Sequence, residues 1–257
     1  MEVESAGGAA GGQAPQTSPN TRSQFSPSTF RMRVSDQPRR SMAAVRLPRS
    51  PWVANPMGMA GGLARRMGGG DKSLLALAGR PLLAHVIERA GPQVGPLILN
   101  ANGDPGRFES FGLPVVADVI KGFAGPLAGI LTGLEWARQH APGIAWMASF
   151  AGDAPFLARN LVARLAQAVE EGAADLACAT SGGRTHPVFG LWPVRLAGDL
   201  RRALVDEGER KIDAWTARHR IVHVDFPCLP YDPFFNVNRP EDLAEAERLL
   251  TGTGDAA

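Results

Sequence analysis

Cysteine, lysine and long apolar runs are scarce in this 257-residue sequence, and two of these scarcities exclude a class of protein. The two cysteines, Cys178 and Cys228, are too far apart for a Cys-x-x-Cys metal or redox motif and too few for a disulfide framework. The five histidines are scattered without metal-ligand spacing, which argues against a structural zinc site. The longest apolar candidate, Ile144–Ala151, is far shorter than the ~18 residues that span a bilayer. We therefore expect neither a structural zinc site nor an integral membrane protein.

Positive charge is concentrated near the start of the chain. The formal net charge is +2, yet residues 1–50 contain seven arginines against three acidic residues. The remaining residues show no basic stripe of the kind that a nucleic-acid-binding face needs, so no nucleic-acid partner is expected. Only three lysines occur in the whole chain, which makes each of them a candidate for a specific role.

Composition divides the chain at about residue 57. Residues 1–56 are rich in Gly, Ser, Pro and Arg and poor in aliphatic side chains, so they cannot bury enough apolar surface to offset the entropy of ordering. We predict that they are disordered or reflect a wrongly assigned start, with Met57 as the alternative. They lack the apolar segment of a secretory signal, so a cytoplasmic protein is expected. Residues 57–250 are the predicted folded domain, and 251–257 a flexible tail.

From residue 57 onward, short apolar segments alternate with segments of helical spacing. Such alternation predicts a single α/β/α domain with a mostly parallel sheet and helices on both faces. Strands are predicted at Pro96–Asn100, Leu113–Ala117, Ile144–Ala151, Asp175–Thr180, Val188–Trp192 and Ile221–Phe226. Helices are predicted from Pro81 and from Pro126, and at Asn160–Glu171, Leu196–Glu207, Ile212–His219 and Glu241–Leu250.

A glycine-rich basic loop is the strongest local pattern. Residues 61–72 are GGLARRMGGGDK, with five glycines, two arginines and a lysine. Glycine lets backbone N–H groups approach an anion closely, and arginine and lysine add charge that suits a triphosphate. The Walker A pattern and the Gly-x-Gly-x-x-Gly pattern are both absent. The loop is therefore predicted to bind phosphate groups in some other way.

Polar side chains follow several predicted strands, where open α/β sheets bind their ligands. Asp118 and Asp153 each come just after a strand, and we expect these two strand ends to be adjacent. Magnesium takes one or two carboxylates together with substrate phosphates, so this pair is a candidate metal site. Asn100 follows another strand and has both a donor and an acceptor, which suits either a nucleobase or ribose edge or a simple turn.

Several segments, taken in order, carry a family resemblance. They are AGGLARRMGGGDK at 60–72, LNANGD at 99–104, FGLPVVAD at 111–118, GFAGPLAGIL at 122–131, GDAPFL at 152–157, HPVFGLW at 186–192 and FNVNRPEDL at 235–243. Over residues 59–250 the chain resembles the molybdenum cofactor guanylyltransferases. The resemblance implies a nucleotide-diphospho-sugar transferase-like fold and Mg²⁺-dependent transfer of GMP from GTP to the phosphate of molybdopterin, with release of pyrophosphate. It also implies an association with cofactor-insertion proteins.

The resemblance assigns three groups of site residues. GTP is implied to contact Met59, Ala60, Gly61, Gly62, Lys72, Asn100, Asp118 and Asp153. Catalysis is implied to depend on Lys72, Arg66 and Asp153, with Asp153 as the Mg²⁺ ligand. Molybdopterin is implied to contact Asn236 and Asn238. An acceptor phosphate is already ionised at pH 7, so the reaction requires no general base, which agrees with the absence of an obvious catalytic histidine.

The segment before the glycine loop departs from the family pattern, which has a hydrophobic strand there. Here Asn55, Pro56 and Gly58 interrupt residues 52–59, and all three are unfavourable in a central strand. We therefore predict either a damaged first strand or a wrong reading frame upstream. The alternatives to guanylyl transfer are a related cytidylyltransferase, a sugar-phosphate nucleotidylyltransferase and a non-catalytic nucleotide- or cofactor-binding protein.

Overall fold

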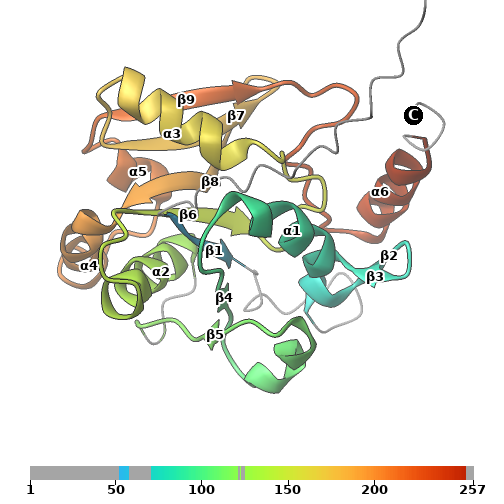
Figure 1. Ribbon diagram of the computed structural model, residues 1–257, viewed down its shortest axis with the longest axis horizontal. Coiled ribbons are helices and arrows are strands. Elements are labelled where there is room, and N and C mark those ends of the chain that lie inside the picture. Colours follow the sequence, from blue (N-terminus) through green and yellow to red (C-terminus); the bar gives the residue numbers. More distant parts are fainter. Residues whose placement is uncertain (1–51, 58–70, 121, 123–124, 253–257) are drawn as a thin grey trace, which may run out of the picture. The chain divides into compact units, whose positions relative to one another are not determined.

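The computed structural model describes residues 52–57, 71–120, 122 and 125–252, and of 52–57 it describes the backbone alone. Contacts divide the chain into two units, Met1–Val45 and Arg46–Ala257. All described residues belong to the second unit, and these residues are drawn in colour in Figure 1. Of the segment predicted to be disordered, 1–56, residues 1–51 lie outside the described residues, and so do residues 253–257 of the tail predicted at 251–257. Residues 52–56 belong to a strand, and residues 251–252 to the last helix.

A seven-stranded sheet with the order β5-β4-β1-β6-β8-β7-β9 forms the centre of this unit (Figure 1). Within the described part of this sheet, only β8 runs antiparallel to its neighbours. The predicted mostly parallel sheet is therefore confirmed. The strands are β1 (Trp52–Met57), β4 (Leu99–Asn100), β5 (Val115–Val116), β6 (Trp146–Ala151), β7 (Leu176–Ser181), β8 (Arg184–Pro193) and β9 (Ile221–Phe226).

The first strand forms despite its unfavourable residues, so the prediction of a damaged strand is wrong. β1 pairs in parallel with β6 from Trp52 to Met57, and it pairs in parallel with β4 at Met57. Proline removes one donor from a ladder, and the other residues of the strand keep theirs, which explains why pairing continues through Pro56. β1 begins at Trp52, ahead of the domain boundary expected at residue 57.

Helices cover both faces of the sheet, as a three-layer α/β/α domain requires. One face packs against α1 (Leu82–Ala90) and α3 (Leu161–Glu171), and it presents Ala177 and Ala179 of β7 to them. The other face packs against α2 (Pro126–His140), α4 (Ala197–Val205) and α5 (Ile212–Thr216), with Leu176 and Cys178 of β7. The alternation along β7 follows from the two-residue period of a strand.

A small hairpin and the last helix pack together beside the sheet. β2 (Ala76–Leu77) and β3 (Arg80–Pro81) pair antiparallel, and Leu77 shares an apolar cluster with Ala246 of α6 (Pro240–Gly252). Figure 1 shows α6 next to this hairpin. Short 3-10 helices connect other elements: η1 (Lys72–Leu74), η2 (Gly91–Gln93), η3 (Pro105–Phe111) and η4 (Val194–Leu196). No helix in the described part of the chain combines the length and apolar character needed to cross a membrane.

β8 begins earlier than the sequence predicted, at Arg184 instead of Val188. The reason is a tight turn at Gly182 and Gly183, whose φ angles of 53° and 75° suit glycine and return the chain directly from β7 into β8. The pairing of Ser181 with Arg184 closes this hairpin. The turn therefore places the start of β8 beside the carboxyl end of β7.

Candidate functional site

Asp153 lies just past the carboxyl end of β6, the strand next to β1 at the centre of the sheet. The residue is only 5% exposed, and its Oδ1 has no hydrogen-bond partner among the described residues. Its backbone carbonyl accepts a hydrogen bond of 2.9 Å from the N–H of Val237. A buried carboxylate oxygen without a partner is costly, so its retention here favours a functional role.

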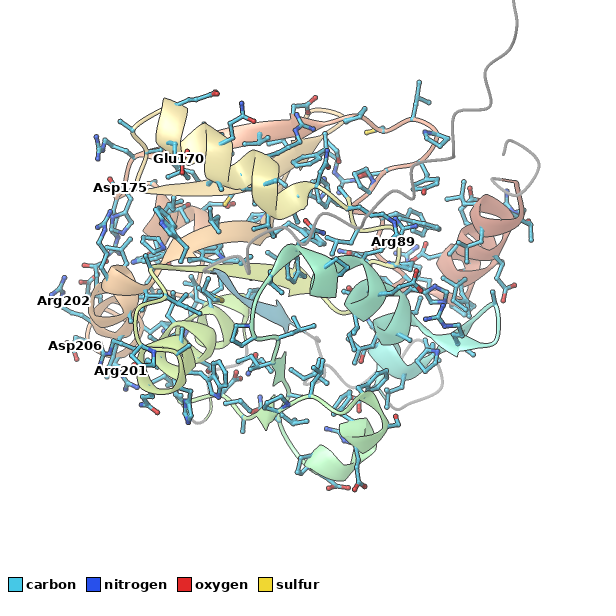
Figure 2. All side chains as sticks on the ribbon, in the orientation of Figure 1. Arg89, Glu170, Asp175, Arg201, Arg202 and Asp206 are labelled. Carbon is cyan, nitrogen blue, oxygen red and sulfur yellow. The ribbon has the colours of Figure 1, made fainter. Side chains whose placement is uncertain are left out.

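The turn that follows Asp153 is held by side chains of α1 and η2. Arg89 donates through Nη1 to the carbonyl oxygen of Leu157 at 3.3 Å, and Figure 2 shows this arginine on α1. Gln93 donates through Nε2 to the carbonyl oxygen of Ala158 at 2.9 Å. These bonds tie the segment after Asp153 to a neighbouring helix, and so fix the turn in place.

Burial raises the pKa of Asp153, while a backbone hydrogen bond and the positive charge of Lys72 act in the opposite direction. A bound divalent cation would offset the cost of the ionised form and occupy the free oxygen. Within the described residues no group of three or more His, Cys, Asp or Glu could hold a metal ion. One carboxylate supplemented by substrate phosphates fits magnesium, which is seldom held by protein ligands alone.

Lys72 begins η1, directly after the glycine-rich loop. Its Nζ donates to Oδ1 of Asn238 at 3.0 Å. The backbone N–H groups of Asn238 and Arg239 donate to Oδ2 of Asp242 at 2.8 and 2.9 Å, which fixes this segment to the first turn of α6. Asn236 is exposed, and its carbonyl oxygen accepts a 3.4 Å bond from Nδ2 of Asn238. The structure thus brings Asn238 to Lys72, and through Val237 to Asp153.

A second polar cluster lies where β4 and β5 end. Asn100, which is 6% exposed, donates through Nδ2 to Oδ1 of Asp118 at 3.0 Å and to the carbonyl oxygen of Val116 at 3.0 Å. Asn102 donates to the other oxygen, Oδ2, of Asp118 at 2.8 Å, and its own Oδ1 accepts from the Asp118 N–H at 2.9 Å. Both oxygens of Asp118 therefore bind amide groups.

The expected adjacency of Asp118 and Asp153 is wrong. Asp118 follows β5 at the edge of the sheet, Asp153 follows β6, and both β4 and β1 lie between those strands. Strand order depends on how the crossovers are placed, which local patterns do not specify. Because amides occupy both oxygens of Asp118, the free oxygen of Asp153 is the better candidate for a metal.

A serine, a histidine and an aspartate meet at the end of β7 without forming a hydrolytic triad. Ser181 donates to Oδ1 of Asp232 at 2.8 Å, and its hydroxyl lies 2.7 Å from Nε2 of His186. A triad requires the carboxylate to contact the histidine, with the serine on the other side of the ring. Here the serine stands between the two. The same oxygen of Asp232 also accepts the N–H of Phe234 at 2.9 Å, so the cluster anchors the segment that leads to Asn236 and Asn238.

Sequence reasoning missed one arginine at the site. Arg107 of η3 forms an ion pair with Asp71, the residue before Lys72. No local pattern marks Arg107, because its partner lies 36 positions earlier in the chain. The predicted loop and catalytic residues Met59, Ala60, Gly61, Gly62 and Arg66 lie outside the described residues.

A family model and curated relatives match most of the part of the chain that follows residue 58. The family model "MobA-like NTP transferase domain" matches residues 59–222. A molybdenum cofactor guanylyltransferase from Bradyrhizobium sp. (strain ORS 278) is 62% identical over 191 residues, which cover 74% of this chain and 90% of that protein. Another, from Rhodopseudomonas palustris (strain BisB5), is 58% identical over 191 residues, which cover 74% of this chain and 91% of that protein.

Solved structures agree on the fold. Molybdopterin-guanine dinucleotide biosynthesis protein A from Archaeoglobus fulgidus has a TM-score of 0.60 at 25% identity, with 78% of this chain and 99% of that chain covered. Rv0371c from Mycobacterium tuberculosis H37Rv, solved in complex with manganese, has a TM-score of 0.54 at 18% identity, with 78% of this chain and 100% of that chain covered. The predicted nucleotide-diphospho-sugar transferase-like fold is confirmed.

Proposed function

Since this chain belongs to the molybdenum cofactor guanylyltransferase family, we propose that its active site is the edge of the sheet that carries Lys72 and Asp153. Its reaction is the transfer of GMP from GTP to the phosphate of molybdopterin, with release of pyrophosphate. The single observation that supports this location is the buried Oδ1 of Asp153, which has no hydrogen-bond partner among the described residues. The N–H of Val237 bonds the backbone carbonyl of Asp153, and the next residue, Asn238, accepts a hydrogen bond from the Nζ of Lys72.

Each described residue has a role suited to its chemistry. Lys72 would stabilise the negative charge that develops on the pyrophosphate leaving group, because an ammonium group aimed at developing charge lowers the barrier. Asn100 and Asp118 would contact the nucleoside part of GTP through their remaining acceptor positions, because both Nδ2 hydrogens of Asn100 are already donated within the cluster. Asn236 and Asn238 would contact molybdopterin. The glycine loop at 59–62 and Arg66 complete the proposed GTP site.

Magnesium is the divalent cation we propose for Asp153. Its free carboxylate oxygen and raised pKa fit a hard cation that completes its coordination with substrate oxygens and water. When bound, Mg²⁺ supplies positive charge at the α-phosphate, where two anionic groups must approach each other. Rv0371c shares the fold and was solved with manganese, which supports a divalent cation in general.

Direct measurement of nucleotide transfer tests the proposal. Purified full-length protein would be incubated with molybdopterin, Mg²⁺ and GTP, CTP or ATP, and the dinucleotide product and pyrophosphate quantified. We expect product with GTP alone, and at least an ~100-fold lower kcat for Asp153→Asn. The control is Asp206→Asn, an exposed aspartate at the end of α4 (Figure 2), which should retain wild-type rates.

Other outcomes would replace parts of the proposal. Selective use of CTP would make the protein a cytidylyltransferase. Full activity of Asp153→Asn would move the metal site elsewhere. Beyond GTP and molybdopterin, cofactor-insertion proteins are proposed partners, and the cytoplasm is the proposed location.

A further inference from the structure

One guanidinium group joins the two polar clusters of the proposed site. Arg107 Nη1 donates to Oδ2 of Asp71. Its Nη2 donates to the carbonyl oxygen of Asn102 at 2.6 Å, and its Nε donates to the carbonyl oxygen of Asp104 at 2.9 Å. Three of its nitrogens thus contact three different acceptors, which is the multi-point binding that a planar guanidinium allows and a lysine does not.

The contacts of Arg107 reach both sides of the site. Asp71 directly precedes Lys72, whose Nζ contacts Asn238 near Asp153. Asn102 holds both the N–H and the carboxylate of Asp118, which also binds Asn100. A single side chain therefore fixes the residue next to the phosphate-binding lysine relative to the cluster assigned to the nucleoside.

Burial makes this ion pair more than a surface contact. The side chain of Asp71 is 5% exposed, and that of Arg107 is 33% exposed. Removing one member of a buried pair leaves the other charge uncompensated, which is far more disruptive than losing an exposed pair. Without Arg107, the negative charge of Asp71 would no longer be neutralised, and it would lie next to Lys72, the residue proposed to attract the triphosphate.

The backbone around Arg107 is shaped to present it. Gly103 has a φ of 87°, and a Cβ added there would lie 3.3 Å from Nη2 of Arg107. Asp104 caps η3 by accepting the Gly106 N–H at 2.9 Å. The guanidinium also lies over the ring of Phe108, 5.1 Å from its centroid. The loop and the first turn of η3 thus hold the side chain in one orientation.

We propose that Arg107 is a positioning residue for GTP: it neutralises Asp71 and holds Lys72 in register with the Asn100–Asn102–Asp118 cluster, so that both ends of the nucleotide are bound at once. This inference rests on the proposed function, because it takes GTP as the ligand of both clusters. Arg107 acts through Asp71 and Asn102 and has no assigned contact with the substrate.

Steady-state kinetics of Arg107→Met and Arg107→Lys on the full chain test this role. Misplacing one half of a two-part binding site weakens nucleotide binding, so we expect Arg107→Met to raise the KM for GTP about 10- to 100-fold. The kcat should fall by a smaller factor than the KM for GTP rises, because Lys72 also acts on the leaving group, and the KM for molybdopterin should change less than about threefold. Arg107→Lys keeps the positive charge but cannot contact all three acceptors at once, so it should give an intermediate KM for GTP.

A charge-removal variant separates positioning from folding. In Asp71→Asn/Arg107→Met the unpaired carboxylate is gone, so the KM for GTP should be about tenfold lower than in Arg107→Met alone. A purely structural defect would lower the active fraction, and with it kcat, and leave KM unchanged. Arg159→Met is the matched control, because Arg159 pairs with Glu88 at the surface with its side chain 60% exposed.

Calorimetric titration with GTP keeps the two proposals distinguishable. A wild-type protein that binds GTP but transfers nothing overturns the proposed function, and Arg107 is then judged on the Kd for GTP. A wild-type protein that binds no GTP overturns both. An unchanged KM and Kd in Arg107→Met and Arg107→Lys overturns the role of Arg107 alone. If Arg107→Met does not fold, a wild-type KM in Arg107→Lys and in Asp71→Asn gives the same negative answer.

Discussion

At the scale of single residues, the buried carboxylate of Asp153 is suited to binding a cation but lowers the stability of the folded protein when no cation is bound. Burial raises its pKa, so the folded protein holds the proton more tightly than the unfolded chain does. Protonated Asp153 therefore adds to the free energy of unfolding below the ordinary aspartate pKa of about 3.9. This contribution is lost as the pH rises through the raised pKa that Asp153 has in the folded protein. At neutral pH without metal, the ionised carboxylate therefore destabilises the fold.

Asp153→Asn should consequently increase the free energy of unfolding at pH 7 in EDTA, and this advantage should disappear below about pH 4. Mg²⁺ should raise the melting temperature of the wild type and leave the variant unchanged, because only the carboxylate binds the ion. Thermal melts with and without Mg²⁺ measure both effects. Equal metal stabilisation of the two proteins would contradict the assignment of Asp153.

At the scale of elements, β8 depends on the absence of a side chain at Gly190. An added Cβ would lie 2.4 Å from Cζ2 of Trp192, which is fully buried, and 3.1 Å from the backbone carbonyl oxygen of Ala177. Trp192 cannot move freely, because it also donates through Nε1 to Ser149 at 2.7 Å. The carbonyl of Ala177 is part of the backbone of β7 and is fixed by the sheet. The close packing of β8 on β7 therefore requires glycine.

Gly190→Ala should destabilise the protein by about 1–3 kcal/mol, the usual cost of overpacking a core. Gly198→Ala is the matched control, since nothing lies within 4 Å of the added Cβ on α4. That change should be neutral or stabilising by up to about 1 kcal/mol. Urea unfolding of the two variants measures the difference. A similar midpoint for both would show that β8 tolerates a side chain there.

Asp175 joins the starts of two neighbouring strands, β7 and β9. It accepts hydrogen bonds from Nη2 of Arg195 at 2.6 Å and Nε of Arg220 at 3.1 Å, and Figure 2 shows it at the end of the sheet away from Arg89. The hydrogen bonds from Arg220 and Arg195 hold the pKa of this carboxyl well below its usual range. A lowered pKa stabilises the fold above the unfolded pKa, and this stabilisation is lost as pH falls through the folded value.

Asp175→Asn should therefore lower the melting temperature at pH 7, and the difference from wild type should shrink as the pH falls below about 4. The effect should be ~1 kcal/mol or less, because both arginine side chains are more than half exposed and solvent screens the pairs. Melting curves at several pH values, repeated in 1 M salt, check this. A difference that persists in both acid and high salt would contradict an electrostatic cause.

At the scale of the whole molecule, the folded unit depends on a strand that composition assigned to the N-terminal extension. β1 lies between β4 and β6 in the middle of the sheet. A chain that begins at Met57 would lack all but the last residue of β1. Both neighbouring strands would then present unpaired ladder edges in the middle of the sheet.

A truncated chain of residues 57–257 should accordingly aggregate or show no cooperative unfolding, whereas residues 46–257 should melt close to the full chain. Size-exclusion chromatography and thermal melts of the two truncations test this. Cooperative folding and GTP binding by the shorter chain would show that β1 is dispensable, and would support Met57 as the natural start.

Local patterns determined much of the architecture because helices, strands and turns depend on neighbouring residues. The apolar spacing after Pro81 and Pro126 predicted α1 and α2, and Ile221–Phe226 was predicted with the bounds that β9 has. The ordered motifs also determined the family, which the relatives confirm. In the candidate site, the sequence singled out Lys72 and Asp153, since each directly follows a recognisable loop or strand.

Only the tertiary structure decided which of those residues meet. Strand order separated Asp118 from Asp153, and the fold brought Arg107 to Asp71 across 36 positions of sequence. It also paired β1 with β6 through Pro56, where strand propensity argued against a strand. The physical reason is common to all three: such contacts depend on how crossovers stack strands and helices in space, and a stable packing outweighs weak local preferences.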